Sequence, residues 1–296
     1  MEFKPGDVSQ PKLHGYLLGA VAPRPIALVS TVDGNGNVNL SPFSFFNVFS
    51  SNPPIAIFSP ARRGRDNTTK HTYENVKETK ECVINVVSYD MVQQTSLSSS
   101  EYEKGINEFT KAGFTEVKST LIQPPGVLES PVRLECIVKD VVELGETGGA
   151  GNLVICEVKL LHIVDQILDE KGHIDPNKIK LVGRMGGNWY NKAYGEALFS
   201  VEKPLAEPGI GVDLIPEDIR SSTILSGNDL GILGNAKEMP DETSVNEYKL
   251  LELAELFIQH EDDPKKLELE IHLKAKKLIQ ENRVEEAWKT LLSFNN

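Results

Sequence analysis

The sequence predicts a mainly β protein with helices appended at its C-terminal end. Short β-branched runs separated by turn residues recur through residues 1–200, with few helical patterns between them. Residues 244–296 instead repeat apolar side chains at helical spacing. Strands spaced this closely favour an antiparallel barrel or sandwich over a doubly wound parallel sheet.

The predicted strands begin and end at turn signals. Ile26–Val32 ends at Asp33-Gly34-Asn35-Gly36, a tight-turn sequence, and Val38–Leu40 begins the returning strand. Two long runs flank a Gly-rich loop at 145–152, which indicates a hairpin. The predicted strands are 26–32, 38–40, 55–59, 82–87, 132–144 and 153–167, and short helices are expected at 69–79 and 91–98.

The C-terminal part differs in pattern from the rest. Pro204 to Pro240 is rich in Gly and Pro, which suggests an irregular wrapping connection. A capping box at Ser244–Glu247 and an Asp263-Pro264 helix start follow it. The helices resemble one tetratricopeptide hairpin, too few for a solenoid. We therefore expect a β domain at 1–200, a connection at 201–240 and a helical extension at 241–296 that covers the barrel or a partner subunit.

Charge and composition exclude several kinds of partner. The 296 residues contain 31 Lys and Arg against 43 Asp and Glu, a net charge of −12. Such an acidic chain is not expected to bind nucleic acid or an anionic membrane. Its three separated cysteines predict reduced thiols, and its first residues show no signal peptide, so we expect a cytoplasmic protein.

One uncharged segment stands out from this composition. Gly34–Ala61 has no charged residue, and four prolines interrupt it, so it is not a membrane span. Phenylalanines and small polar residues alternate within Asn39–Asn47. Apolar surface with main-chain donors and hydroxyls suits a flat aromatic ligand that has a polar rim. The alternative interpretation is an aromatic core with capped turns, and composition alone leaves both open.

A cluster of cations follows this segment. Arg62–Thr72 contains four cations, four hydroxyl or amide side chains and one carboxylate, and a helix is predicted to begin at its end. Guanidinium groups, hydroxyls and a helix N-terminus together suit a phosphate group. The alternative is a solvated turn with a threonine N-cap.

These motifs, taken in order, resemble one known family. The stretches PRPIALVST, NLSPFSFFN and RDNTTKHTYENVKETKECVINVV are similar to those of flavin reductase-like proteins, the FMN-binding split-barrel family. The resemblance covers roughly residues 10–200. It implies a six-stranded Greek-key split β-barrel, a homodimer, and FMN held near the subunit interface.

The resemblance also implies which residues contact FMN. The SPFSFFN segment matches the part that lines the isoalloxazine ring, and the end of the preceding strand matches a second contact to the ring edge or ribityl chain. Arg65 and the threonines after it stand where the family has a phosphate anchor, with Arg in place of the usual Lys and Thr displaced. The implied cofactor-binding residues are Ser30, Thr31, Ser41, Pro42, Phe43, Ser44, Phe45, Phe46, Asn47, Arg62, Arg65, Thr68, Thr69, Lys70 and Arg184, with Tyr190 beside the last.

The expected function is that of an FMN-binding oxidoreductase. FMN would take hydride from transiently docked NAD(P)H and pass electrons to free flavin or to an acceptor protein. The six histidines are dispersed, so neither a metal site nor a catalytic acid or base is indicated. The alternatives are an electron carrier, a pyridoxamine-phosphate-oxidase-like flavoprotein, and a non-catalytic flavin-binding interaction module.

Overall fold

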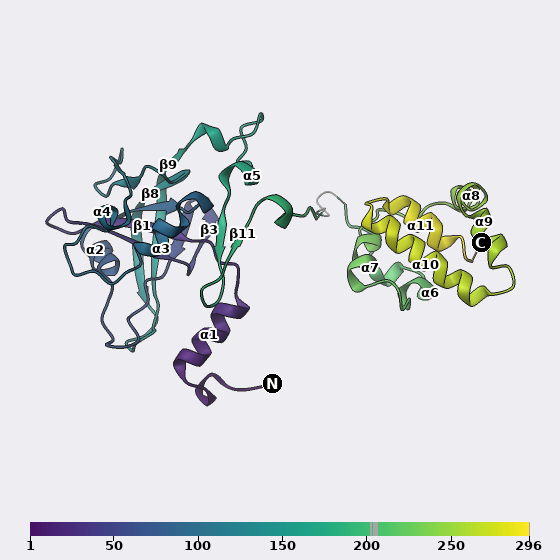
Figure 1. Cartoon of the computed structure of the whole chain (residues 1–296), viewed down its shortest axis with the longest axis horizontal. Coiled ribbons are helices and arrows are strands. Elements are labelled where there is room, and N and C mark those ends of the chain that lie inside the picture. Colours follow the sequence, from purple (N-terminus) through teal and green to yellow (C-terminus); the bar gives the residue numbers. More distant parts are fainter. Residues whose placement is uncertain (202, 204–206, 296) are drawn as a thin grey trace. The chain divides into compact units, whose positions relative to one another are not determined.

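The computed structural model describes residues 1–201, 203 and 207–295. It divides the chain into two compact units, Met1–Phe199 and Ser200–Asn296 (Figure 1). The first unit is built on an antiparallel sheet and the second from helices, so the predicted class of a mainly β protein with a C-terminal helical part is confirmed.

The first unit contains a seven-stranded sheet in which every neighbouring pair is antiparallel. Its order is β2-β1-β5-β8-β9-β4-β3, so strands distant in the sequence lie side by side. β8 and β9 form the long hairpin expected around the Gly-rich loop. The strands are β1 (Ala27–Val32), β2 (Val38–Phe43), β3 (Phe46–Ser51), β4 (Pro54–Phe58), β5 (Glu81–Val86), β8 (Val132–Glu143) and β9 (Asn152–Ile163).

Strand β1, which lies between β2 and β5, is buried on both faces. Ala27 and Val29 pack in the main core with Phe58 and Ile84. Leu28, on the opposite face, belongs to a second apolar cluster that includes residues of the helices nearby. Burial on both faces explains why Ala27, Leu28 and Val29 are consecutive apolar residues, with no exposed polar residue between them.

Short helices and hairpins complete the first unit. The predicted helices at 69–79 and 91–98 appear as α2 and α3. The structure adds the helix α1, which buries none of its residues in the unit and so has no apolar face that the sequence pattern could indicate. These elements are α1 (Gln10–Ala20), α2 (His71–Thr79), α3 (Val92–Leu97), α4 (Glu108–Ala112), α5 (Pro176–Ile179), and the strand pairs β6 (Glu116–Val117) with β7 (Gly126–Val127) and β10 (Val182–Arg184) with β11 (Tyr190–Lys192).

The second unit is a helical domain with its own core. Ile219 and Leu233, from the segment expected to be an irregular connection, pack with Ile271 and Trp288 of the last helices. The Trp288 indole also donates to the Leu233 carbonyl at 3.2 Å. Its helices are α6 (Glu217–Arg220), α7 (Gly227–Gly234), α8 (Glu242–Tyr248), α9 (Ala254–Gln259), α10 (Pro264–Gln280) and α11 (Val284–Leu292), with a π-helical stretch at Lys249–Leu253.

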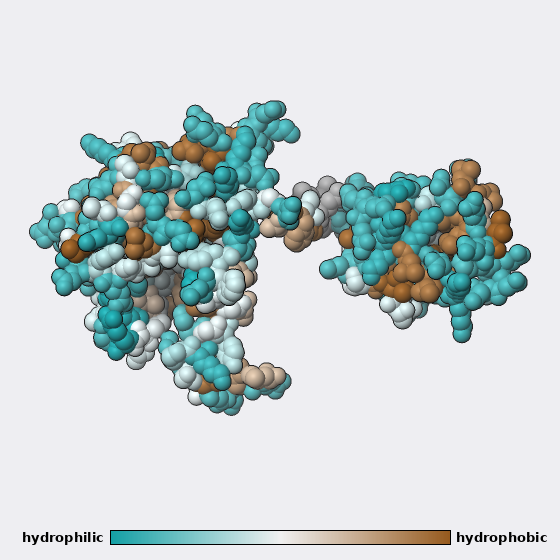
Figure 2. Space-filling view, in the orientation of Figure 1, coloured by the Kyte–Doolittle hydropathy of each residue, from teal (hydrophilic) through white to brown (hydrophobic). Residues whose placement is uncertain are grey.

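The helical domain therefore begins earlier than the capping signals suggest. Asp241, not Ser244, caps α8 by accepting from the Ser244 amide at 3.0 Å, whereas Asp263 caps α10 as expected. Leu250, Leu251 and Ile258 remain largely exposed, and Figure 2 shows hydrophobic surface on this domain.

The cysteines and the helix lengths bear on two further expectations. Cys82, Cys136 and Cys156 are free and buried in the core of the sheet, as expected of reduced thiols. Within the described residues, no helix is long and apolar enough to span a membrane.

Candidate functional site

A basic hollow forms where the uncharged segment meets the cluster of cations. Strand β2 contributes Asn39 and Ser41, the loop before α2 contributes Arg63 and Lys70, and the turn after α3 closes the hollow with serines. The residues that line this basic hollow are Asn39, Ser41, Arg63, Lys70, His71, Thr72, Ser98, Ser99, Ser100, Glu101, Tyr102 and Glu108.

Arg63 is the best-placed cation of the hollow. Its guanidinium is fixed by donating to the Thr68 hydroxyl at 3.0 Å and to the Thr69 carbonyl. Its Nε is buried and makes no hydrogen bond, although it lies 3.4 Å from the Glu101 carboxylate. A buried guanidinium nitrogen without an acceptor is costly, so an incoming anion would gain a charge-assisted bond here.

Lys70 stands at the N-terminus of α2 and is partly buried. Burial, and to a lesser degree the neighbouring Arg63, lowers the pKa of its ammonium group. Its Nζ lies 5.9 Å from the ring centroid of Phe43. Desolvation and like charge both disfavour the protonated form, so an anion placed between Lys70 and Arg63 would be strongly stabilising.

The other predicted phosphate contacts have partners of their own. Arg65 is 70% exposed and pairs with Glu101 at 2.6 Å, and Arg62 donates to the Asn67 side chain and carbonyl. The Thr68 hydroxyl donates to Asp66 at 2.7 Å, and that of Thr69 to Glu74 at 2.9 Å. The structure thus brings Lys70 into the hollow and leaves Arg62, Arg65, Thr68 and Thr69 around its loop.

Glu101 contacts the arginines of the cation loop, so an anionic ligand would compete with its carboxylate. Its carboxylate contacts both Arg63 and Arg65 and lies at the rim of the hollow. A second carboxylate, Glu108, is buried in the wall and accepts from the Leu40 amide at 2.9 Å. Burial raises the pKa of Glu108, which reduces its repulsion of an anion.

The predicted ring segment alternates between the core and the surface. Phe43 is buried against Phe58, with ring centroids 5.4 Å apart, and Phe46 also packs on the core. Ser41 faces the basic hollow, and Pro42 beside it is half-buried. Ser41 and Phe43 are two residues apart in β2 and share a face, so the hollow continues the face that Phe43 presents to the core.

The turn between β2 and β3 presents the rest of the segment. Phe45 is 42% exposed and touches the His14 ring of α1 edge-on. The Ser44 hydroxyl accepts from Arg24 at 3.4 Å, and Asn47 is exposed, its side chain accepting from the Val48 amide. Aromatic rings and polar side chains thus lie close together at this turn.

Ser30 and Thr31 lie inside the protein rather than on the hollow. Both side chains are fully buried in β1. The Ser30 hydroxyl donates to the Pro125 carbonyl at 2.5 Å, and the Thr31 hydroxyl accepts from Asn75 of α2 at 3.0 Å. They hold α2 and a neighbouring loop against the sheet, which positions the hollow.

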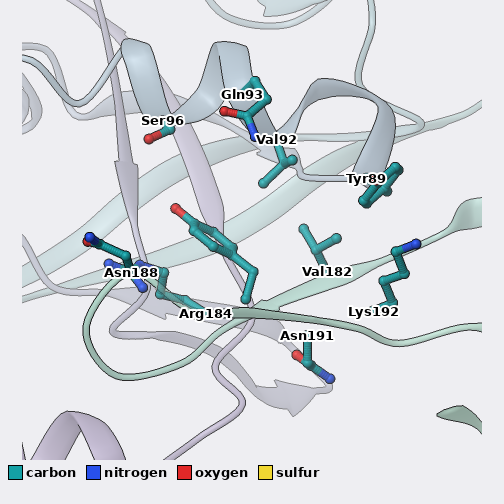
Figure 3. Close-up of a pocket in the computed structure, with 10 residues that line it drawn as sticks. Tyr89, Val92, Gln93, Ser96, Val182, Arg184, Asn188, Asn191 and Lys192 are labelled. Atoms are coloured by element: carbon teal, nitrogen blue, oxygen red, sulfur yellow. The ribbon is translucent and has the colours of Figure 1, made fainter.

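Arg184 lies outside the basic hollow, in a second cavity of about 370 Å³ between α3 and the β10–β11 hairpin (Figure 3). Its main chain pairs with that of Arg24 through bonds of 3.0 and 2.8 Å. Arg24 is buried and donates to the carbonyls of Leu18, Val21 and Met185. Arg24 thereby ties the end of α1 to the loop after β10.

Sequence reasoning missed several residues of the hollow. Asn39 and Thr72 join its two sides through a 2.9 Å bond between their side chains, and the serines at 98–100 close it. The signal available was the run Ser98-Ser-Ser-Glu101, which places small hydroxyls beside an acid. Only the tertiary fold shows that this run faces the cation loop.

Comparison with known proteins identifies the family. The model of the flavin reductase like domain matches residues 19–195. A protein of Aquifex aeolicus is 37% identical over 201 residues, which are 68% of this chain and all of that protein. Since the family model covers more than half of the sequence, the chain belongs to the flavin reductase-like family of split-barrel flavoproteins.

Solved structures agree with this membership. Nitrilotriacetate monooxygenase component B from Bacillus cereus is 28% identical with a TM-score of 0.63, over 68% of this chain and 98% of that one. A Shewanella frigidimarina protein assigned as a flavin reductase with a split barrel domain is 25% identical with a TM-score of 0.58, over 69% and 99%. These relatives are matched along nearly their whole length by about two thirds of this chain.

Proposed function

We propose that the chain is an FMN-binding oxidoreductase whose phosphate site is the basic hollow. The observation that carries this proposal is the buried Nε of Arg63, which makes no hydrogen bond, in a hollow that Lys70 also lines. Ser41, at the start of the predicted ring segment, lines the same hollow. One ligand could therefore place a phosphate on the two cations and its ring along residues 41–47, and the residues present fit FMN.

The chain's own residues would bind and orient the cofactor. Arg63 and Lys70 would hold the phosphate, with the serines after α3 as further donors. Main-chain groups and hydroxyls of residues 41–47 would meet the ring edge, and Ser44 is already oriented by Arg24. Bound FMN would supply the hydride and electron chemistry, so the protein need not supply a nucleophile.

We further propose NAD(P)H as the reductant, docking transiently on the exposed ring face. Electrons would then pass to free flavin or to an acceptor protein. The named relatives include a monooxygenase component and a flavin reductase, which supports a reductase role. An electron carrier and a pyridoxamine-phosphate-oxidase-like activity are the alternatives within redox chemistry.

We also propose a homodimer. Phe45, Val48 and Phe49, around β3, and Tyr16 and Leu17 of α1 are all at least 40% exposed. The contact between His14 and Phe45 places α1 beside this turn. Apolar side chains that gather on one surface favour burial against another subunit.

Two measurements test the proposed function. Isothermal titration should show FMN binding at least tenfold tighter than FAD, a difference of about 1.4 kcal/mol, because the hollow offers one compact anion site. Oxidation of NADH or NADPH should be faster with bound FMN than without it. FMN binding without turnover would favour the non-catalytic module, and equal or tighter binding of FAD would contradict the cofactor assignment.

A further inference from the structure

The second cavity, beside α3, shares no lining residue with the basic hollow. α3 and the turn before it contribute Tyr89, Val92, Gln93 and Ser96. The β10–β11 hairpin contributes Val182, Arg184, Asn188, Tyr190, Asn191 and Lys192. The cavity of about 370 Å³ is within the range of small-molecule sites, and no carboxylate lines it.

The hairpin aims one face at this cavity. Val182 pairs with Lys192 and Arg184 pairs with Tyr190, and paired residues of antiparallel strands share a face. The intervening pair, Gly183 and Asn191, faces the other way: a Cβ on Gly183 would lie 2.6 Å from Pro23. Figure 3 accordingly shows Asn191 turned away from α3.

The face of the hairpin that lines the cavity carries a cation toward each end and an apolar side chain between them. Figure 3 places Lys192 near Tyr89 at one end and Arg184 near Asn188 at the other. The two cations are offset by two residues along the hairpin, which is about 7 Å. Val92 and Val182 lie between these ends.

Both cations are held in place by an aromatic ring, and the Arg184 guanidinium also donates to the carbonyls of Met185 at 3.2 Å and Trp189 at 2.9 Å. The Arg184 guanidinium lies 4.7 Å from the Tyr190 ring centroid, and the Lys192 ammonium 4.6 Å from that of Tyr89. In the described part of the chain, neither forms an ion pair with a carboxylate; nearby Asp90 pairs with Lys180 instead. Two such cations in a chain of net charge −12 are an attractive site for an anion.

The cavity also adjoins the predicted ring segment. Arg184 and Arg24 are paired through their main chains, and the Arg24 side chain reaches Ser44. Ser96 lines this cavity while Ser98, two residues on, lines the basic hollow. A ligand in the cavity would thus be a neighbour of a flavin bound along residues 41–47.

We infer that this cavity binds an aromatic anion, the molecule that exchanges electrons with the flavin. Its ring would lie on Val92, Val182 and the tyrosines, and its carboxylate or phosphate would meet Lys192. The inference rests on the proposed function for its redox role. It assigns Lys192 to substrate recognition and not to FMN binding.

The test uses the full chain loaded with FMN. Isothermal titration compares 2-naphthoate with its neutral amide in the wild type and in Lys192→Gln. We expect the acid to bind at least tenfold tighter than the amide, and Lys192→Gln to reduce that preference at least fivefold without changing FMN affinity. Lys171→Gln, at an exposed turn of the same unit, is the control and should behave as the wild type.

A second arm identifies the source of the anion. If Lys192→Gln raises KM for NADPH or NADH, the anion is the phosphate of the dinucleotide; if only naphthoate affinity falls, it is the electron acceptor. Equal binding of acid and amide, an unchanged preference in Lys192→Gln, or displacement of FMN by naphthoate would each overturn the inference. If FMN itself fails to bind, the proposed function fails, and the same titration without FMN still decides whether the cavity holds an aromatic anion.

Discussion

Individual residues of the basic hollow determine how it should respond to pH. Burial lowers the pKa of Lys70, so it loses its proton at a lower pH than an exposed lysine. The protonated form binds phosphate, and above about pH 7 a phosphate monoester stays a dianion because its second pKa is near 6. FMN affinity should therefore fall as pH rises through the lowered pKa of Lys70.

The control for this pH dependence is Lys70→Met. Any titration of the flavin itself affects both proteins equally, so the difference between their binding curves isolates Lys70. Isothermal titration from pH 7 upward should show the two affinities converging. A constant ratio across the alkaline range would mean that Lys70 does not contact the phosphate.

Removing the charge of Glu101 is expected to strengthen FMN binding, whereas removing that of Lys70 weakens it. Its carboxylate lies 3.4 Å from Arg63 Nε and competes with an anionic ligand. Glu101→Gln removes that competitor and should tighten FMN binding by up to about fivefold, since a partly exposed ion pair contributes about 0.2–1 kcal/mol. Fluorescence quenching of titrated FMN measures the change, with Glu103→Gln as the neighbouring control. Weaker binding in Glu101→Gln would show that Glu101 supports the site.

The sequence locates the cluster of cations at Arg62–Thr72, but it does not show which of these side chains face the hollow. Arg62, Arg63 and Arg65 are equivalent in the sequence, yet only Arg63 lines the hollow. Which side a loop residue faces depends on partners such as Glu101, 36 residues after Arg65. Ser30 and Thr31 are polar residues of a strand, and their full burial follows from contacts with Pro125 and Asn75, which are distant in the sequence.

Among the elements, α1 has a side-chain anchor at its C-terminal end, Arg24, in addition to the ring contact between His14 and Phe45. Arg24 donates to the Leu18 and Val21 carbonyls at 2.7 Å and to Met185 at 3.1 Å. Arg24→Ala should loosen the C-terminal end of α1, because three partly buried carbonyls lose a charged donor worth about 1.5–3 kcal/mol per bond. Hydrogen exchange of residues 10–20 should accelerate at least tenfold, and Arg65→Ala, an exposed arginine, should leave it unchanged. Unaltered protection in Arg24→Ala would mean that other contacts hold α1.

The sheet could be predicted better than the elements around it. β1, β4, β5, β8 and β9 follow apolar runs and turn signals, which are local properties. β3 lies within a segment whose phenylalanines suited a ligand site equally well, so no strand was assigned there. The order of the strands depends on pairing between distant residues, as in β4 with β9, which no local pattern specifies.

For the whole molecule, the helical core includes side chains from the segment 201–240, for which an irregular connection is predicted. Leu225 and Leu233 belong to the helical core, so a chain cut near Lys237 would expose them without α10 and α11. A fragment of residues 1–199 should instead fold alone and bind FMN within about twofold of the full chain, because every residue lining the hollow lies within it. Circular dichroism confirms folding before titration; a well-folded fragment that loses FMN would show that the helical domain completes the site.

The central claim is that Lys70 and Arg63 hold the phosphate of a bound flavin. Titration of the wild type, Lys70→Met and Arg65→Ala with FMN and with riboflavin, which lacks the phosphate, tests this most directly. The account predicts that the wild type and Arg65→Ala prefer FMN by at least tenfold, or about 1.4 kcal/mol, and that Lys70→Met loses most of that preference while its riboflavin affinity is unchanged. Equal affinity of the wild type for both ligands, or a preference lost in Arg65→Ala and kept in Lys70→Met, would contradict it.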